Sequence, residues 1–228
     1  MNQRTLKAAF LNTIPVMTGY LFLGIGFGII LQQNGFGLIW AIAMSTFIYA
    51  GSMQFVGVGL LTGGAGFVAT ALTTLMVNAR HLFYGISMVD AYKDAGKKKP
   101  YLIFALSDET YSLVSNPVLP DGVNRIPYCF LVSLFDQCYW ILGSVLGALL
   151  GNLPIDFTGI DFALTALFLT IFVEQWLSTK NHFPALVGVG AAVLCLVIFG
   201  ANHFLIPTMI LIAAILVIAR KDGKEATA

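Results

Sequence analysis

The 228-residue chain has the composition of a protein embedded in lipid. Hydrophobic residues make up 58% of it and charged residues only 10%, whereas about 25% of the residues of an ordinary soluble domain are charged. A soluble protein of this length could not cover its surface with so few charges, which excludes a soluble enzyme. The net charge of +1 gives no electrostatic basis for binding nucleic acid.

Apolar segments follow one another along almost the whole chain. A helix needs roughly 20 apolar residues, at about 1.5 Å each, to span a bilayer. We predict one all-α, polytopic transmembrane domain over residues 1–228, with a front half (1–116) and a back half of four spans (128–220). The apolar segments cover residues 14–31, 38–61, 66–89, 101–116, 128–150, 160–178, 184–201 and 204–219.

Basic residues indicate the orientation of the chain, because cytoplasmic loops carry an excess of Lys and Arg. The loop with Asp156 and Asp161 has neither and should lie outside. If the first three segments all crossed the membrane, the lysine run would also face outside, so one of them should fail to cross. The groups that should be cytoplasmic, together with both termini, are Arg4/Lys7, Lys93–Lys99, Lys180 and Arg220/Lys221/Lys224.

Two front-half segments contain features of broken helices. Segment 38–61 is interrupted at Ala50-Gly51-Ser52, and the short segment 101–116 has Ser107-Asp108-Glu109-Thr110 in its middle. Transporters build substrate sites at broken segments of this kind. We predict about six full transmembrane helices plus these two broken or re-entrant segments. The alternative is eight full spans and one violation of the orientation rule.

The richest polar cluster in an apolar segment is the run Asn78-Ala79-Arg80-His81-Leu82-Phe83-Tyr84. Residues three or four apart share a helix face, so Asn78, Arg80, His81 and Tyr84 can form one polar face. An Arg at the centre of a membrane helix costs about 2.5–3.5 kcal/mol, so it should be paired or line a wet cavity. We predict that Arg80 holds an anionic group and that His81 titrates. The alternative is that Arg80 snorkels to the headgroups and His81 is a core residue.

Asp108 and Glu109 are adjacent carboxylates, which point about 100° apart on a helix. Close carboxylates repel, so one tends to stay protonated, which suits an ammonium site or a proton relay. The alternative is an interfacial helix whose acids face water.

The break at Gly51, Ser52 and Gln54 has two interpretations: close packing of small residues, or backbone groups that bind a carboxylate. We favour the second, because the orientation rule independently requires a break here.

The remaining polar groups give weaker indications. Asp136, inside segment 128–150, fits a helix–helix hydrogen bond as well as a functional role. Cys129, Cys138 and Cys195 are scattered in apolar sequence without a Cys/His cluster, so we expect no metal or other cofactor. The chain has no HExxH or GxSxG motif, and we expect no enzymatic activity.

Three motifs, in this order, resemble the AzlC family: Ala50-Gly51-Ser52-Met53-Gln54-Phe55, Asn78-Ala79-Arg80-His81-Leu82-Phe83-Tyr84-Gly85 and Ser107-Asp108-Glu109-Thr110-Tyr111. That family forms the large subunit of bacterial branched-chain amino acid exporters, including the valine exporter. The resemblance implies export of L-valine, leucine and isoleucine across the cell (inner or plasma) membrane. It also implies a small AzlD-like membrane subunit as partner and coupling to the proton gradient.

An amino acid zwitterion needs a cationic or dipolar partner for its carboxylate, an acid for its ammonium group and an apolar pocket. We therefore predict a substrate site and an overlapping proton-coupling group. The substrate residues are Gly51, Ser52, Gln54, Asn78, Arg80, Tyr84, Asp108 and Glu109, the proton-coupling residues are His81, Asp108 and Glu109, and the apolar walls are Met53, Phe55 and Phe83. The alternatives are a channel or facilitator for a small neutral solute and a non-transporting membrane scaffold.

Overall fold

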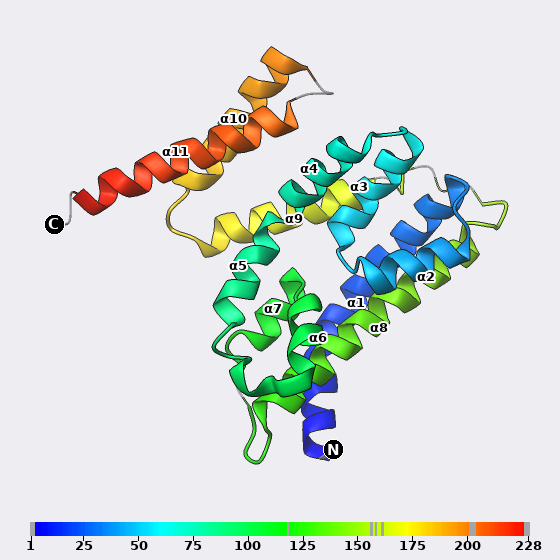
Figure 1. Ribbon diagram of the computed structural model, residues 1–228. Helices are drawn as coiled ribbons and strands as arrows, with labels where there is room; N and C mark the ends of the chain where they lie inside the picture. The colour runs from blue at the N-terminus through cyan, green and yellow to red at the C-terminus, as the bar shows by residue number, and fades with distance from the viewer. Residues whose placement is uncertain are drawn as a thin grey trace. The chain divides into compact units, whose positions relative to one another are not determined.

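The computed structural model describes residues 3–117, 119–155, 157, 159–160, 162–200 and 204–225, and all regular structure among these residues is helical (Figure 1). The chain forms two compact units, Met1–Thr165 and Ala166–Ala228, which we describe separately. The elements are α1 (Gln3–Gln33), α2 (Leu38–Phe47), α3 (Gly51–Thr62), α4 (Phe67–Val77), α5 (Ala79–Met88), η1 (Lys93–Lys98), α6 (Lys99–Phe104), α7 (Asp108–Val114), α8 (Arg125–Leu150), α9 (Phe162–Ser178), α10 (Phe183–Phe199) and α11 (Leu205–Glu225).

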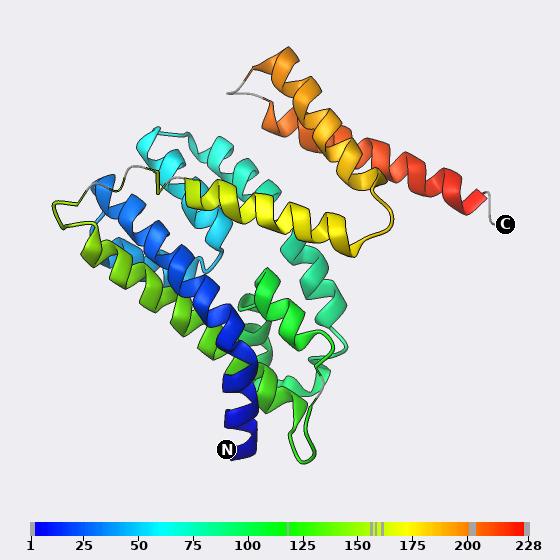
Figure 2. The same cartoon turned by 180° about the vertical axis from the view of Figure 1, so that it is seen from behind.

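Helices α1 and α8 are long and apolar enough to cross a membrane. They lie side by side, as Figures 1 and 2 show. Near their starts, Asn12 Nδ2 donates to Tyr128 OH at 2.8 Å. At the other end, Gln32 Nε2 donates to Asn152 Oδ1 at 2.8 Å. Residue numbers rise together along both helices, so the helices are parallel and both begin at the same end of the first unit.

Glycines allow α1 and α8 to come into backbone contact. Gly24 and Gly28, four residues apart on α1, face Gly143 and Gly147, four apart on α8. A Cβ atom on Gly28 would overlap the backbone of Ser144 and the following turn, and one on Gly147 would overlap the backbone of α1. Small residues at this spacing are how membrane helices approach closely, since lipid supplies no hydrophobic force between them.

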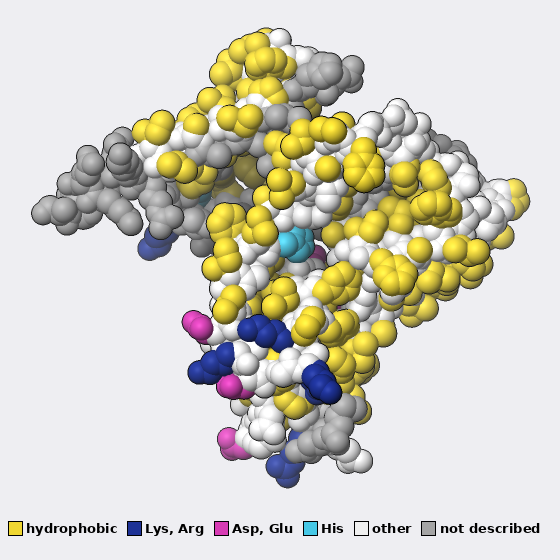
Figure 3. All heavy atoms as spheres, viewed as in Figure 1, with side chains coloured by type: hydrophobic (Ala, Val, Ile, Leu, Met, Phe, Trp, Pro, Cys, Tyr) yellow, Lys and Arg dark blue, Asp and Glu magenta, His cyan; other side chains and the backbone are white. Residues whose placement is uncertain are grey.

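A buried cluster gathers the starts of α1 and α8 with the polar end of the unit. It includes Ala9 from α1, Tyr92 and Ala95 around η1, Leu102 from α6 and Tyr128 from α8. In Figure 3 the Lys, Arg, Asp and Glu side chains of the first unit gather mainly at one end, and hydrophobic side chains are spread over the rest of the visible face, which shows few charges. Such a surface suits a bundle with lipid around its middle and water at its end.

The two breaks predicted from the sequence are present. Segment 38–61 is split into α2 and α3. Tyr49 between them has a φ of 44°, a backbone conformation that residues other than Gly rarely adopt. Segment 101–116 is split into α6 and α7. We did not predict a third break: segment 66–89 is two helices, α4 and α5, that meet at Asn78, whose φ of −94° and ψ of 6° are not helical.

The last three predicted segments correspond to α9, α10 and α11. Helix α9 crosses the boundary between the units, and α10 packs against α11 within the second unit (Figure 1). Helices α9 and α10 have 17 residues each, so the number of full spans stays a prediction, as does the division into two halves. Asp156 and Asp161, on which one side of the orientation argument depended, lie outside the described residues.

Gly28→Ala should destabilise the protein, because the added methyl group forces the two helix backbones apart. We expect the free energy of unfolding to fall by about 1–3 kcal/mol, as for other overpacked sites. Gly19→Ala on the same helix is the matched control: nothing lies within 4 Å of its Cβ position, and Ala is favoured over Gly in helices by about 1 kcal/mol. Thermal unfolding in detergent checks both, and equal midpoints would contradict the close contact.

Candidate functional site

Arg80 joins the three broken segments to one another. Its Nη1 lies 2.9 Å from Asp108 Oδ2 in an ion pair, and its Nη2 donates to Ser52 Oγ at 3.0 Å. All three residues occupy the first or second position of a helix that starts at a break: α3, α5 and α7. The side chains of Arg80 and Asp108 are 34% and 26% exposed, so the pair is partly accessible. The prediction that Arg80 holds an anionic group is consistent with this geometry.

The helix termini act in opposite directions on the two charges. The start of a helix carries a partial positive charge, which favours Asp108 in the first turn of α7 and disfavours Arg80 in the first turn of α5. Arg80 therefore depends on its carboxylate partner. Ser107 caps α7 by accepting a hydrogen bond from the Thr110 backbone N–H at 3.0 Å, which is a role that Ser commonly fills.

Tyr84 completes the coordination of Asp108. Its hydroxyl donates to Asp108 Oδ1 at 2.7 Å, so both carboxylate oxygens are engaged. Tyr84 lies one turn after Arg80 on α5, as the spacing predicted. Its ring stacks on that of Tyr111 from α7 at a centroid distance of 4.4 Å. The hydroxyl of Tyr111 accepts a hydrogen bond from Ser87 instead.

Glu109 faces a different group from Asp108. Tyr20 OH, from α1, donates to Glu109 Oε2 at 2.7 Å and lies 2.5 Å from Ser107 Oγ. The two adjacent acids therefore diverge, as consecutive helical positions require. Asp108 belongs to the ion pair, and Glu109 belongs to a group of hydroxyls.

His81 and Asn78 lie at the break between α4 and α5. His81 Nδ1 is 3.3 Å from the backbone oxygen of Asn78, and its ring lies edge-on to Tyr84 at 5.8 Å. Asn78 Oδ1 is buried and has no hydrogen-bond partner within the described part of the chain. His81 thus borders the ion pair through Tyr84.

Gly51 and Gln54 pack the other break against the scaffold. Gln54 is fully buried; its Nε2 donates to Ser45 Oγ at 3.2 Å and its Oε1 accepts from Trp140 Nε1 at 2.8 Å. A Cβ on Gly51 would lie 3.0 Å from the Trp140 ring. Of the three predicted residues at this break, Ser52 is the one that contacts Arg80.

Further residues extend the site and were not predicted as part of it. Tyr20 is one, and no pattern in the first apolar segment singles it out. Thr110 is another, and its Oγ1 donates to Asp136 Oδ2 at 2.7 Å. Asp136 is fully buried. The sequence marked it as a polar residue in an apolar helix but did not connect it to α7.

An apolar pocket of about 330 Å³ lies beside the α2–α3 break. Met53, the residue after Ser52, lines it together with residues of α2, α3 and α4. The other two expected apolar walls lie elsewhere: Phe55 is buried against Phe27, and Phe83 is 71% exposed.

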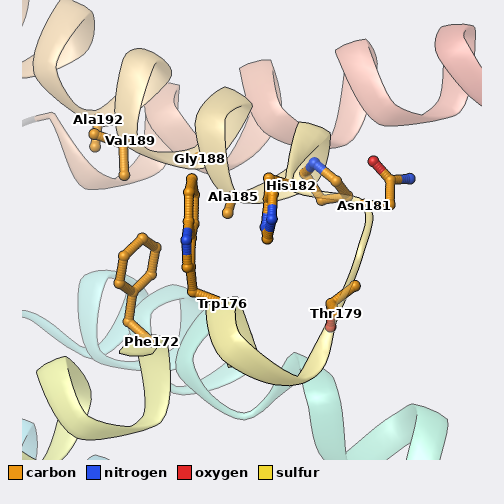
Figure 4. Close-up of a pocket in the computed structure, with 10 residues that line it drawn as sticks. Phe172, Trp176, Thr179, Asn181, His182, Ala185, Gly188, Val189 and Ala192 are labelled. Atoms are coloured by element: carbon orange, nitrogen blue, oxygen red, sulfur yellow. The ribbon is translucent and has the colours of Figure 1, made fainter. Parts of the chain in front are cut away.

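A second pocket, of about 540 Å³, lies within the second unit where α9 leads into α10 (Figure 4). Within it, Trp176 stacks on His182 with ring centroids 4.1 Å apart. None of the predicted site residues lines this pocket.

Broken helices that bring charged side chains together within a largely apolar helical unit are typical of membrane transport proteins. Comparison with known proteins identifies the family of this chain. The AzlC protein family matches residues 15–153. In an alignment of 232 positions, the chain is 44% identical to the branched-chain amino acid transport protein AzlC of Bacillus subtilis. The alignment covers 99% of this chain and 91% of that protein. The chain belongs to the AzlC family, which confirms the resemblance.

Other relatives are named as membrane proteins. An uncharacterized membrane protein of Haemophilus influenzae is 44% identical, with 90% of this chain and 84% of the relative covered. The inner membrane protein YgaZ of Escherichia coli is 25% identical, with 88% and 82% covered. No solved structure matches the chain.

Tyr84→Phe should weaken the site without unfolding it. It removes the hydrogen bond to Asp108 but keeps the stack on Tyr111, and a hydrogen bond to a charged group is worth about 1.5–3 kcal/mol. We expect the apparent KM for the transported substrate to rise by about tenfold or more. Tyr111→Phe is the control, since its hydroxyl does not touch Asp108; equal effects of the two substitutions would contradict the assignment.

Proposed function

We propose that this protein exports branched-chain amino acids, L-valine, leucine and isoleucine, from the cytoplasm, and that it moves them without converting them chemically. Export is coupled to the proton gradient and uses a small AzlD-like membrane subunit. The name of the Bacillus relative supports the substrate class. The observation that carries the proposal is the partly exposed Arg80–Asp108 pair where three helix breaks meet. The partner and the direction of transport rest on the family resemblance.

The ion pair matches the charges of a zwitterion. The substrate's carboxylate takes the place of Asp108 at the Arg80 guanidinium, and its ammonium group takes the place of Arg80 at the Asp108 carboxylate. Each of the two side chains thereby exchanges its internal partner for a ligand group of the same charge. No unpaired charge is left in the membrane. Ser52 hydrogen-bonds Arg80 and Tyr84 hydrogen-bonds Asp108, so each charged side chain has a second partner when the ion pair opens.

The side chain of the amino acid enters the apolar pocket beside the α2–α3 break. Its volume of about 330 Å³ lies at the lower end of the roughly 300–1,000 Å³ that is common for small-molecule sites. Met53 lines this pocket and follows Ser52 directly. A polar contact and an apolar contact are thus available from successive residues of α3.

The proton-coupling residues remain His81, Asp108 and Glu109. Asp108 is released from Arg80 when substrate binds, and Glu109 is one residue further along α7. His81 is the group of the three whose ordinary titration range is closest to neutral pH. Protonation of any of these three residues changes the charge of the site by one unit.

We further propose a multi-pass topology with both termini in the cytoplasm and with segments 38–61 and 101–116 entering the membrane without crossing it. The parallel course of α1 and α8 supports placing the N-terminus and the linker before α8 on one side. The buried cluster that joins Ala9 of α1 to Ala95 of η1 supports placing the lysine run on that same side.

The Arg80→Gln/Asp108→Asn double variant separates substrate binding from structural pairing. Each single substitution leaves a partner charge unpaired, which costs about 3–5 kcal/mol for a buried pair and less here because the pair is partly exposed. The double variant removes both charges and should regain thermal stability. We expect it to fold and still to transport no valine in loaded cells or proteoliposomes.

Recovery of valine transport in that double variant would show the ion pair to be structural and would overturn the site. The matched control is Lys97→Gln/Asp94→Asn, which removes one cation and one exposed anion from η1. This control should transport at the wild-type rate.

Single cysteines should report the topology. In a chain whose three native cysteines are replaced, Lys97→Cys in η1 and Asp121→Cys before α8 should react with a membrane-impermeant maleimide from the cytoplasmic side alone. Gln33→Cys, exposed at the end of α1, should react from the outside alone. Labelling of Lys97→Cys from the outside would refute the re-entrant arrangement.

A further inference from the structure

A continuous chain of hydrogen bonds runs from Glu109 to the buried side chain of Asp136. Tyr20 OH lies 2.7 Å from Glu109 Oε2 and 2.5 Å from Ser107 Oγ. Ser107 Oγ lies 3.0 Å from Thr110 Oγ1, which lies 2.7 Å from Asp136 Oδ2. Tyr20, Thr110 and Asp136 are at most 5% exposed. The chain therefore leads from the site into the core between α1, α7 and α8.

The number of protons in this chain depends on its two ends. Each of the three hydroxyl groups can donate one hydrogen bond, but the chain has four oxygen-to-oxygen links. When both carboxylates are ionised, one link has no proton. A single extra proton, on either Glu109 or Asp136, fills all four links, with every donor pointing away from the protonated acid.

The extra proton can pass along the chain without leaving it. From protonated Glu109, one proton moves to Tyr20 OH as the Tyr20 proton moves to Ser107, the Ser107 proton to Thr110 and the Thr110 proton to Asp136. Four O–H bonds form and four break. Glu109 ends as the carboxylate, Asp136 ends as the acid and the hydroxyls are restored.

The surroundings of Asp136 favour a group that holds a proton. Its Oδ1 is buried without a hydrogen-bond partner among the described residues, and no Lys, Arg or His in the described part of the chain pairs with it. An ionised carboxylate in such a place is costly. The titratable groups that face it are Glu109, Tyr20 of α1, Tyr49 between α2 and α3, Tyr101 of α6 and Tyr128 of α8.

We propose that Asp136 is the inner proton-binding group of this protein, and that Tyr20, Ser107 and Thr110 exchange one proton between it and Glu109. Its part in coupling rests on the proposed proton-linked export, whereas the hydroxyl chain exists whatever the protein transports. Asp136 and Thr110 act at a distance from the substrate, through Glu109.

Gradient-driven accumulation of valine in proteoliposomes tests the coupling. For one coupled proton, a gradient of one pH unit supports an accumulation of about tenfold, since each unit corresponds to about 1.4 kcal/mol. Asp136→Asn and Thr110→Val should reduce this accumulation to about onefold, that is, to none. Isotope exchange of valine at equal pH on both sides should fall much less, because exchange needs no net proton movement.

Two further variants separate the proton chain from packing. Thr110→Ser keeps the hydroxyl that Thr110→Val removes, and should accumulate valine about tenfold as the wild type does. Ser133→Ala is matched to Asp136 in helix and burial, and its hydroxyl takes no part in the chain; it should accumulate valine as the wild type does. Full accumulation by Asp136→Asn, or equal loss of accumulation and exchange in a Thr110→Val protein of normal thermal stability, would overturn the proposal.

Infrared spectroscopy tests the chain without any transport. The wild-type protein at neutral pH should show the carbonyl stretch of one protonated carboxylic acid, shifted in D₂O. The band should be absent from the Asp136→Asn/Glu109→Gln variant. If the band is present but valine does not move, the proposed export is wrong and the proton chain stands. If valine is exported but the band is missing, the proton chain is wrong and export stands.

Discussion

The need to pair one arginine inside an apolar helical unit organises the candidate site. A charged guanidinium in lipid costs about 2.5–3.5 kcal/mol or more, and Arg80 stands at a helix start, where the macrodipole opposes it. Its partners come from two other broken segments: Asp108 of α7 and Ser52 of α3. The same breaks that expose polar backbone groups thus deliver the side chains that satisfy the arginine. Removing any one break would leave this cation without part of its coordination.

The parallel pair of α1 and α8 supplies the fixed surface on which the broken segments rest. Its glycines bring the two backbones together, and its polar side chains then reach outward to the short helices. Trp140 of α8 binds Gln54 of α3, Asp136 of α8 binds Thr110 of α7, and Tyr20 of α1 binds Glu109. Short helices have little stability of their own. Each of these contacts therefore fixes a half-helix that could not hold its position alone.

The sequence predicted more of the site than of its supports. Arg80 and Asp108 were recognised because charge is costly in an apolar segment, Tyr84 because helical spacing groups it with Arg80, and the structure brings all three together. The break at Asn78 was missed, since the flanking residues 67–77 and 79–88 read as one apolar helix and a break without Gly or Pro has no local signal. Tyr20 was missed for a different reason: its partner Glu109 is 89 positions away. Single-chain periodicity carries no information about contacts at that distance.

The ion pair and the hydroxyl chain are joined through one short element. Residues 107–110 are consecutive at the start of α7: Asp108 holds Arg80, while Ser107, Glu109 and Thr110 belong to the chain that ends at Asp136. A seven-residue helix moves as a unit, so a shift of α7 that separates Asp108 from Arg80 also displaces three oxygens of the chain. Hydrogen bonds weaken steeply once distance and angle depart from their optimum. In the proposed site, substrate binding that separates the ion pair would therefore also interrupt the proposed proton chain, without any contact between the substrate and Asp136.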